Sequence, residues 1–404
     1  MSQLDLFTPA LTDGELPPVA LTPEIESLLA KNAPVAIGVS GGKDSGAAVW
    51  AVVNHLNQIG HTGPRLLIHA DLGRIEWADS LPICQQLADL FGLELVVVRR
   101  PAGGMVERWM SRWDGNCTRY ADLACVKLIM PWSSPANRFC TSELKTAIIS
   151  RELTRRFPGQ RIVSVSGIRR QESSKRAQKP ICSEQARLTV KTLGTSGVDW
   201  NAIIEWKLDH VWNCHKWHNL PIHEAYSTYN MTRVSCCFCI MSSLPDLLRS
   251  AGCEANQDVY RELVDLEIAS TYAFHEDTWL GDVAPHLLTD EQRTALSGAK
   301  YAARRRELAE SRIPEHLLFT EGWPTRMPTY DEAVLLAEVR QEVADTVGLT
   351  IGFTDPASIL QRYAELMAER AEKQFLADWT EAKRELKALN KRLKEAYEEA
   401  NQTV

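Results

Sequence analysis

Residues 35–46 read VAIGVSGGKDSG, and this stretch decides the expected fold. Its first half is a short apolar run typical of a buried strand, and a helical pattern follows its second half. Gly41 and Gly42 allow backbone N–H groups to approach a ligand closely, and the start of a helix attracts negative charge. The stretch therefore predicts an anion-binding loop between a strand and a helix. The candidate binding residues are Ser40, Gly41, Gly42, Lys43, Asp44 and Ser45.

Further apolar runs repeat this strand-and-helix pattern along the first half of the chain. A helix is predicted from Lys43 to Ile59, ending at Gly60. Strands that alternate with helices are typical of an α/β fold with a doubly wound, mostly parallel sheet, whose ligand lies at the carboxyl ends of the strands. We expect this fold here. Buried strands are predicted at residues 35–40, 65–71, 93–100 and 161–168.

The loop does not match two widespread nucleotide-binding motifs. A Walker loop requires G-x-x-x-x-G-K-[ST], but Ile37 stands five positions before Gly42, and Asp44 follows the lysine. The glycine spacing does not fit G-x-G-x-x-G either. The form SGGKDS after a strand resembles instead the PP-loop of the adenine nucleotide α-hydrolase superfamily, which binds the phosphates of ATP or of a sulfonucleotide.

The aspartate of this loop needs a partner. Asp44 would repel a bare phosphate, so we expect Mg²⁺ or a set of N–H donors to accompany a bound nucleotide. A glycine-rich turn without any ligand is the alternative interpretation of the stretch.

Four downstream segments add polar residues to this pattern. RLLIHAD ends in Asp71 at the carboxyl end of a strand, where a carboxylate can bind a ribose hydroxyl or a metal ion. NRFCTSELK contains Cys140 and Lys145, VSGIRRQESSKRA contains Gly167, Arg169 and Arg170, and RVSCCFC contains Cys236 and Cys239. In this order the segments resemble the phosphoadenosine phosphosulfate (PAPS) reductase family over about residues 34–240.

That resemblance implies that the strand-edge arginines hold a phosphate or sulfate group. Positive side chains would also stabilise charge on the leaving group or the acceptor. We expect Asp71, Gly167 and Arg169 to join the loop in nucleotide binding. The expected catalytic residues are Lys43, Asp44, Lys145, Arg169 and Arg170.

The last cysteine of the chain is Cys253. Family members that reduce sulfonucleotides carry a nucleophilic cysteine near the C-terminus, which this chain lacks. The resemblance therefore favours ATP-using sulfur-transfer members such as the DndC protein of DNA phosphorothioation, with a cysteine desulfurase as a partner. We expect an enzyme that acts at the α-phosphorus of an adenylyl nucleotide in sulfur transfer or nucleic-acid modification. The alternatives are PAPS reduction itself and a nucleotide-binding factor without turnover that is tethered to the bacterial sliding clamp.

The ten cysteines are expected to be thiols or metal ligands, because nothing in the sequence indicates secretion. Cys236 and Cys239 have the C-x-x-C spacing of a metal chelate. Together with Cys140 and Cys253 they are the predicted ligands of a 4Fe–4S cluster. Zinc and the absence of any metal are the alternatives, and Cys237 or a non-protein group could replace Cys253. Three nearby histidines are interpreted as structural: His215, His218 and His223.

Charge is unevenly distributed along the chain. The net charge is -7, yet thirteen Lys and Arg and only four acidic residues lie between Arg138 and Lys191. Such an excess favours a polyanionic partner, either a nucleotide or a nucleic acid such as DNA or tRNA. A solvated basic surface is the alternative. The chain contains neither an apolar run of membrane-spanning length nor a signal peptide, so we expect a cytoplasmic protein without membrane contact.

Three segments are predicted along the chain: a flexible tail at residues 1–21, a PAPS reductase-like domain at 22–254 and a helical region at 255–404. Within the tail, QLDLF from Gln3 to Phe7 resembles the peptide that binds the bacterial sliding clamp, and a simple hydrophobic tether is the alternative.

The last helix is predicted to carry one apolar stripe. Packing of this stripe against the protein's own body and a coiled-coil contact between two copies are both compatible with its spacing. The stripe comprises Trp379, Leu386, Leu389, Leu393 and Tyr397.

Overall fold

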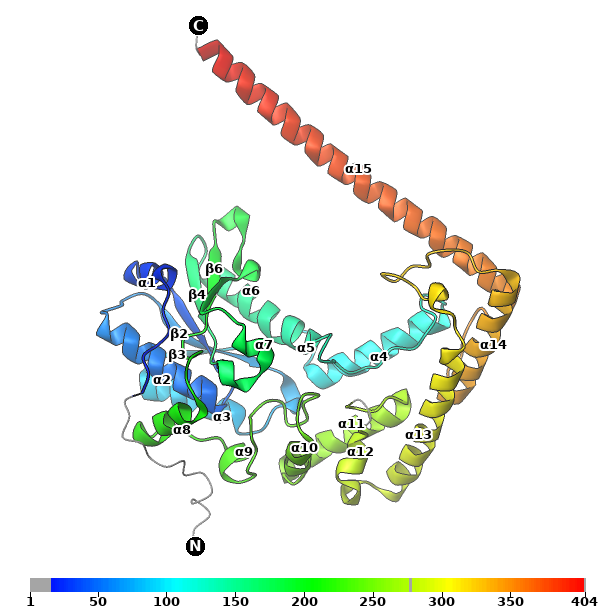
Figure 1. Ribbon diagram of the computed structural model, residues 1–404, viewed down its shortest axis with the longest axis horizontal. Helices are drawn as coiled ribbons and strands as arrows, with labels where there is room; N and C mark the ends of the chain where they lie inside the picture. Colours follow the sequence, from blue (N-terminus) through cyan, green and yellow to red (C-terminus); the bar gives the residue numbers. More distant parts are fainter. Residues whose placement is uncertain (1–15, 276–277, 403–404) are drawn as a thin grey trace. The chain divides into compact units, whose positions relative to one another are not determined.

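The computed structural model describes residues 16–275 and 278–402, with side chains described as far as residue 394 (Figure 1). Six strands in these residues form one sheet in the order β3-β2-β1-β4-β6-β5. Neighbouring strands are parallel except β5 and β6. The predicted doubly wound, mostly parallel α/β fold is therefore confirmed. The strands are β1 (Val35–Gly38), β2 (Arg65–Asp71), β3 (Glu94–Arg99), β4 (Arg161–Val165), β5 (Cys182–Glu184) and β6 (Ser196–Trp200).

The four strands predicted from apolar runs correspond to β1, β2, β3 and β4. The sequence prediction missed β5 and β6. The β6 sequence SGVDW contains a single aliphatic side chain, and β5 is only three residues long, so neither presents a recognisable apolar run.

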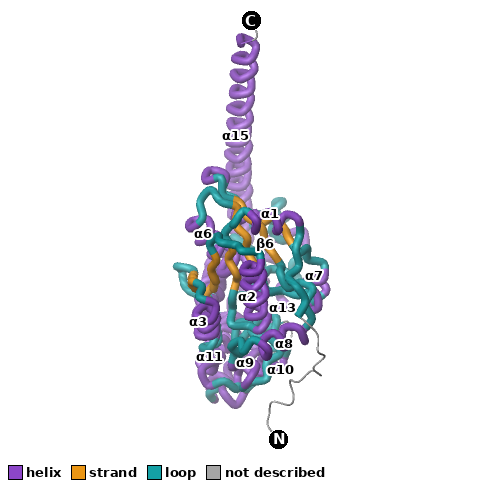
Figure 2. Tube along the Cα trace, turned by 90° about the vertical axis from the view of Figure 1, so that its left-hand side faces the viewer, coloured by secondary structure: helices purple, strands orange, loops and turns teal. Residues whose placement is uncertain are grey.

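Helices connect and cover these strands (Figure 2). The predicted helix after the glycine-rich loop is confirmed as α2, and Gly60 just beyond it has a φ of 69°. The helices of the described residues are α1 (Pro23–Ala30), α2 (Lys43–Gln58), α3 (Ser80–Phe91), α4 (Met105–Ala121), α5 (Phe139–Thr141), α6 (Ala147–Arg156), α7 (Ser174–Ala177), α8 (Leu208–Trp217), α9 (Glu224–Ser227), α10 (Leu244–Ala251), α11 (Gln257–Ser270), α12 (Leu280–Val283), α13 (Asp290–Ser311), α14 (Tyr330–Val347) and α15 (Pro356–Gln402). Short helical turns include η2 (Gly73–Ile75), η4 (Arg170–Glu172), η5 (Ala186–Leu188), η6 (Lys191–Leu193) and one π-helical turn, η3 (Ser142–Thr146).

Alternate side chains of the strands are buried on opposite faces of the sheet. Ile37 and Val165 belong to a core that includes side chains of α1, α2, α3 and α8. On the other face, Ala36 and Ile68 pack in a second core with Leu153 of α6. Both faces of β1 are thus covered, which explains why its sequence is continuously apolar.

The sheet changes direction of winding at β1. Ile37 pairs with Leu67 of β2 on one side and with Val165 of β4 on the other. The chain runs from β1 to β2 and β3 toward one edge, and then continues at β4 on the opposite side of β1. Ligands of doubly wound sheets bind outside the carboxyl ends of the strands at such a point. The loops that follow β1 and β4 therefore border the expected ligand site.

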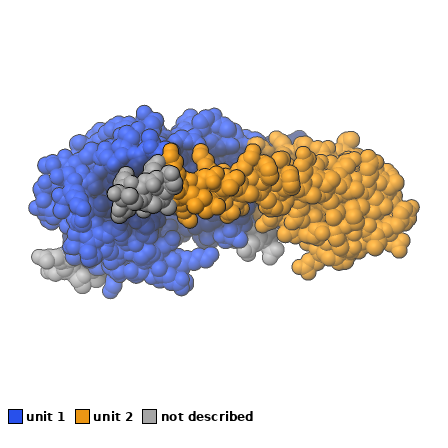
Figure 3. Space-filling model, turned by 90° about the horizontal axis from the view of Figure 1, so that it is seen from above, with its two compact units in different colours: residues 1–110, 132–267, 273–293 blue, residues 111–131, 268–272, 294–404 orange. Residues whose placement is uncertain are grey.

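The chain divides into two compact units (Figure 3). Unit 1 comprises residues 1–110, 132–267 and 273–293, and unit 2 comprises residues 111–131, 268–272 and 294–404. This division differs from the sequence-based boundary at residue 254, because residues 111–131 pack with the C-terminal helices. The sheet and the glycine-rich loop belong to unit 1.

Residues 16–21 are not part of a flexible tail, which corrects the predicted limit at residue 21. Val19 is buried, and the Ala20 N–H donates a hydrogen bond to the Ala202 carbonyl at 2.8 Å. The Trp200 indole N–H donates to the Ala20 carbonyl at 2.7 Å. This segment is therefore held against the end of β6. The predicted clamp-binding peptide, Gln3 to Phe7, lies outside the described residues.

Unit 2 is helical, as predicted for the C-terminal region. Its core contains Arg340 of α14, whose guanidinium is fully buried. The guanidinium donates hydrogen bonds to the carbonyls of Tyr120 at 2.8 Å and Gly352 at 2.9 Å. These bonds offset the cost of burying the charge, and they explain why residues near 120 join unit 2. Within the described part of the chain, each helix is either too short or too polar to cross a membrane.

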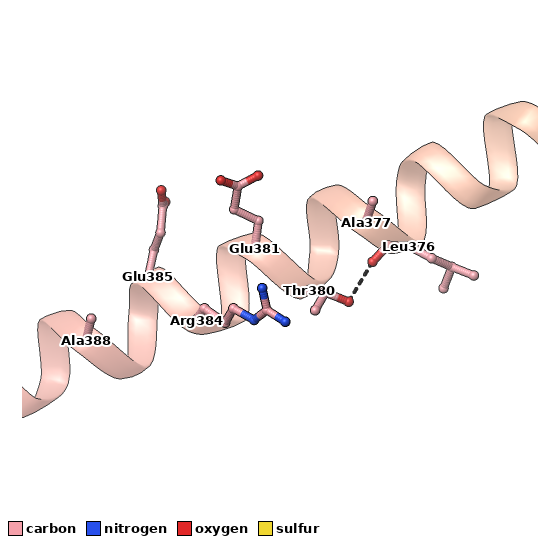
Figure 4. A pocket seen from close by; sticks show the side chains of 7 residues that line it. All are labelled: Leu376, Ala377, Thr380, Glu381, Arg384, Glu385 and Ala388. Carbon is pink, nitrogen blue, oxygen red and sulfur yellow. Dashed lines mark hydrogen bonds between the residues drawn. The ribbon is translucent and has the colours of Figure 1, made fainter. Parts of the chain in front are cut away.

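The last helix, α15, is buried only near its start. Ile359, Tyr363 and Leu366 are buried where α15 packs with α14. A hollow farther along α15 is lined by this helix alone (Figure 4). Because one helix cannot enclose a small molecule, this hollow is not a candidate ligand site. Its lining residues are Leu376, Ala377, Thr380, Glu381, Arg384, Glu385 and Ala388.

Candidate functional site

The glycine-rich loop connects β1 to α2 and turns sharply at Gly41. Gly41 has a φ of 71°, and an added Cβ atom would lie 3.0 Å from the Ser80 carbonyl oxygen, so only glycine fits without strain. Gly42 precedes the first residue of α2. The Ser45 hydroxyl donates to the Gly42 carbonyl at 2.7 Å and accepts from the Ser40 N–H at 3.4 Å. The loop is thereby held closed at the N-terminus of a helix.

Three charged side chains meet at this helix N-terminus. The Lys43 ammonium lies 3.0 Å from the Asp44 carboxylate, and the Arg169 Nε donates to the same carboxylate at 2.6 Å. Lys43 and Arg169 are 5% and 4% exposed, respectively. Burial raises the pKa of Asp44, but the two cations outweigh burial and hold this pKa below its ordinary value. The group carries one net positive charge, which suits an anionic ligand.

The loop after β4 brings Arg169 to this position. A Cβ atom on Gly167 would lie 2.6 Å from the Asp44 carbonyl oxygen, so the two backbones are in close contact. The N–H of Arg169 donates to Glu172 at 2.7 Å, and its guanidinium also donates to Gln171 at 3.1 Å. The segment GIRRQE thus closes on itself and presents Arg169 to the glycine-rich loop.

Two side chains from later segments hold the first turn of α2. The Tyr226 hydroxyl accepts hydrogen bonds from the N–H groups of Lys43 at 3.3 Å and Val234 at 3.0 Å. The His215 Nε2 lies 2.8 Å from the Lys43 carbonyl. Burial lowers the pKa of His215, so its imidazole is neutral and donates this bond. These contacts fix the loop from the side of α8 and α9.

A buried histidine connects the loop to the segment after β2. The ring nitrogens of His69 lie 3.0 Å from the Val39 carbonyl and 3.0 Å from the Glu76 carboxylate. Burial lowers the pKa of His69, but its hydrogen bonds to Cys84 and Glu76 outweigh burial and raise the pKa to about 10. The charged imidazolium therefore donates to both oxygens.

Two of the predicted metal-binding cysteines, Cys140 and Cys239, interact electrostatically with a third, Cys236. Burial, together with the charges of Cys239 and Cys140, raises the pKa of the Cys236 thiol to about 12, although the charge of Lys145 lowers it. These groups are thus within electrostatic range of Cys236. Lys145 belongs to the π-helical turn η3, a distortion that is frequent at functional sites. We refer to Cys140, Cys236, Cys239 and Lys145 as the thiol group.

The fourth predicted ligand, Cys253, does not join the thiol group. Cys253 is buried, forms a hydrogen bond with Tyr229 and interacts electrostatically with Cys237. Across residues 16–275 and 278–402, no set of three or more His, Cys, Asp and Glu side chains is arranged to hold a metal ion. The four cysteines as placed therefore do not fit a four-cysteine cluster, and the metal assignment stays a prediction.

The family of the chain follows from residues 34–256, which match the phosphoadenosine phosphosulfate reductase domain. The chain belongs to the phosphoadenosine phosphosulfate reductase family. Comparison with curated proteins gives no match. Among solved structures, PAPS reductase from Candida auris in a phosphate complex has a TM-score of 0.33 and 11% identity, over 55% of this chain and 98% of that chain. U34-tRNA thiolase NcsA from Methanococcus maripaludis, with its 4Fe–4S cluster, has a TM-score of 0.26 and 15% identity, over 74% of this chain and 81% of that chain.

Arg170 and Asp71, two of the residues expected to act in this PAPS reductase family member, form hydrogen bonds outside the glycine-rich loop. The Arg170 guanidinium donates to Glu205 at 2.8 Å and to the carbonyls of Ala177 and Lys179, so it stabilises the loop around α7. Asp71 lies at the end of β2, where it accepts from Arg99 at 2.9 Å and from the Gly73 N–H at 2.7 Å. The roles expected for Arg170 and Asp71 stay predictions.

The basic segment of this family member is partly neutralised by distant acids. Arg156 pairs with Glu94 at 2.7 Å, Arg170 pairs with Glu205, and Arg169 pairs with Asp44. None of these three acids lies between residues 138 and 191, so a count along the sequence overstates the local excess of positive charge. The segment is less basic on the folded surface than in the sequence.

Sequence reasoning missed several residues that build the site of this PAPS reductase family member. Tyr226 and His69 act through hydrogen bonds to backbone atoms, which leave no motif in a sequence. The structural interpretation of the three histidines agrees with their contacts. His215 holds the loop, and the His223 Nε2 lies 3.2 Å from the Ser80 hydroxyl oxygen. The His218 ring stacks on the Trp50 ring, with 4.0 Å between the ring centroids.

Proposed function

We propose that this chain is a PP-loop enzyme that binds ATP or a related adenylyl nucleotide through the loop between β1 and α2. The main support for this proposal is the buried group of Lys43, Asp44 and Arg169 at the N-terminus of α2. This group lies after β1, the strand at which the sheet changes its direction of winding. The helix dipole, the backbone N–H groups and the net positive charge all favour the nucleotide phosphates. The description of the PAPS reductase family supports an adenylyl nucleotide as the ligand.

The reaction would occur at the α-phosphorus. A nucleophilic oxygen of the acceptor attacks this phosphorus, the bond between the α-phosphorus and the bridging oxygen breaks, and pyrophosphate leaves with that bonding electron pair. The acceptor becomes adenylated, and a sulfur nucleophile can then displace AMP from it. Lys43 and Arg169 would stabilise the charge that develops on pyrophosphate. Mg²⁺ is the expected companion of the nucleotide phosphates.

The thiol group would take part in the sulfur step. Cys236 and Cys239 keep partial exposure, and the positive charge of Lys145 lies within electrostatic range of Cys236. PAPS reduction itself is less well supported, because no cysteine follows Cys253 to attack a sulfonucleotide. We therefore propose sulfur transfer to a small-molecule or nucleic-acid acceptor, with tRNA and DNA as the first candidates. This proposal includes a DndC-like role and a cysteine desulfurase as a partner, and it does not depend on a 4Fe–4S cluster.

Pyrophosphate release tests the proposed function. Purified protein is incubated with Mg-ATP, alone and with tRNA or DNA, and released pyrophosphate is measured. We expect release that depends on an acceptor and that is lost in Lys43→Ala, whereas Lys31→Ala, at an exposed lysine outside the site, retains it. Tight ATP binding without release for any acceptor would favour a nucleotide-binding factor without turnover. Release of sulfite from PAPS with a dithiol reductant would favour a reductase.

A further inference from the structure

The distal half of α15 presents an apolar stripe to solvent. Phe375, Trp379, Leu386, Leu389 and Leu393 are all more than half exposed. No described element covers them, although the same helix buries its apolar side chains near its start against α14. An exposed apolar stripe of this length is characteristic of an interaction surface.

The spacing of this stripe is that of a coiled coil. From Phe375 the core positions follow at intervals of four, three, four, three and four residues, through Trp379, Ala382, Leu386, Leu389 and Leu393. A repeat of 3.5 residues keeps one seam facing a partner helix, whereas packing on a globular body follows 3.6 and produces a wider apolar face. The partner that this seam fits is therefore another helix.

We propose that α15 pairs with α15 of a second copy of this chain in an antiparallel coiled coil. The small side chain of Ala382 determines the direction. In an antiparallel pair with Leu386 against the partner's Leu389, Ala382 lies opposite the partner's Leu393, and a small residue meets a large one. A parallel pair in register would place two alanines opposite each other and leave a gap in the core.

Charges beside the seam agree with this direction. In the antiparallel register, Glu385 lies beside the partner's Arg392, and the twofold axis repeats this contact. A parallel pair would place Glu385 beside the partner's Asn390 instead. Neither Glu385 nor Arg392 forms an ion pair with another described residue. Both side chains are exposed and available.

The area is sufficient for a specific contact. The five large side chains of the stripe each expose on the order of 100 Å². Covering them on both helices, with the stems of the flanking charged residues, buries about 1,200 Å² in total, the lower limit of specific interfaces. The expected dimer is therefore concentration-dependent, and it does not depend on the function proposed above.

Sedimentation velocity of the full chain tests this proposal. We expect a species of twice the monomer mass at micromolar concentration, and only monomer for the double variant Leu386→Asp with Leu389→Asp. Arg384→Asp changes a position on the outer side of the helix and should leave the dimer intact. Circular dichroism and the urea midpoint show whether each variant is folded. A wild-type chain that stays monomeric at these concentrations would overturn the proposal.

A charge exchange tests the direction of the helices. Glu385→Arg alone should raise the dimer Kd about tenfold, because two symmetric attractions become repulsions. Combining Glu385→Arg with Arg392→Glu should restore the wild-type Kd. If the single change has no effect, or if the double variant is not restored, the antiparallel register is refuted even when a dimer forms.

Discussion

Replacing Gly167 by alanine would test how closely the loop after β4 must approach the PP-loop. The new Cβ atom would lie 2.6 Å from the Asp44 carbonyl oxygen, and ordinary contacts begin at 3.4 Å. The two segments must therefore separate by roughly 0.8 Å in a close-packed region. Both sides of this contact are backbone, so no rotamer change relieves it. We expect the free energy of unfolding to fall by about 1–3 kcal/mol.

The same separation should weaken nucleotide binding. Arg169 lies two residues after Gly167, and its 2.6 Å contact with Asp44 depends on the close approach. Loss of one charge-assisted contact to phosphate corresponds to about 1.4 kcal/mol, or a roughly tenfold higher Kd for ATP. Urea unfolding and calorimetric ATP titration measure the two effects.

The matched control for this substitution is Gly298→Ala in α13. Apart from its chain neighbours and the backbone of its own helix, no atom lies within 4 Å of an added Cβ atom at this position. The change should therefore stabilise the helix by about 0.5–1 kcal/mol and leave ATP binding unchanged. A Gly167→Ala variant with the urea midpoint and the ATP affinity of the wild type would refute the argument from close approach.

Three further predictions concern the same site. Asp44→Asn leaves Lys43 and Arg169 buried without a counter-charge, so the unfolding free energy should fall by about 3 kcal/mol. Pyrophosphate should then raise the melting temperature of this variant more than that of the wild type. An equal or smaller rise would contradict the reasoning. If the cysteines hold an iron–sulfur cluster, anaerobically purified protein should be brown, and Cys236→Ala should lose the visible absorption; colourless protein with stoichiometric zinc would refute the iron assignment. Burial lowers the pKa of His223 to about 4, so between pH 6.5 and 4 the unfolded chain binds a proton that the folded chain does not. The free energy of unfolding should therefore decrease by about 3 kcal/mol over this range as the pH falls. His223→Gln should reduce this dependence of stability on pH, as measured by urea titrations at several pH values.

The sequence predicted those parts of the site that depend on neighbouring residues. The strand, the glycine-rich turn and the helix from Lys43 follow one another within a few positions, and local patterns were sufficient to find them. The contact between Asp44 and Arg169 joins residues 125 positions apart and depends on the pairing of β1 with β4. The sequence argument from charge therefore led us to expect Mg²⁺ or a set of N–H donors beside Asp44, and it did not reveal the contact with Arg169.

The cysteines illustrate a second limit of the sequence. Cys236 and Cys239 were found from a motif of four neighbouring residues, and the family resemblance added Cys140 to the predicted ligands. Cys253 was one of three candidates for the fourth ligand, beside Cys237 and a non-protein group. In the structure, Cys253 begins a separate turn, with its thiol near Tyr229 and Cys237. The division into units likewise depends on Arg340 binding the Tyr120 carbonyl, a contact that no periodic pattern reveals.

The Tyr226 hydroxyl links the first turn of α2 to the segment that contains Cys236 and Cys239. One oxygen atom accepts from both the Lys43 N–H and the Val234 N–H, and Val234 lies two residues before Cys236. If a bound phosphate accepts the Lys43 N–H, as the proposed function allows, the Tyr226 hydroxyl keeps only its bond from Val234. If phosphate binding changes the position of Tyr226 in this way, thermodynamic linkage requires that an equal change in phosphate affinity accompany displacement of Tyr226 by the cysteine segment. Nucleotide binding and the chemistry of Cys236 would then depend on each other.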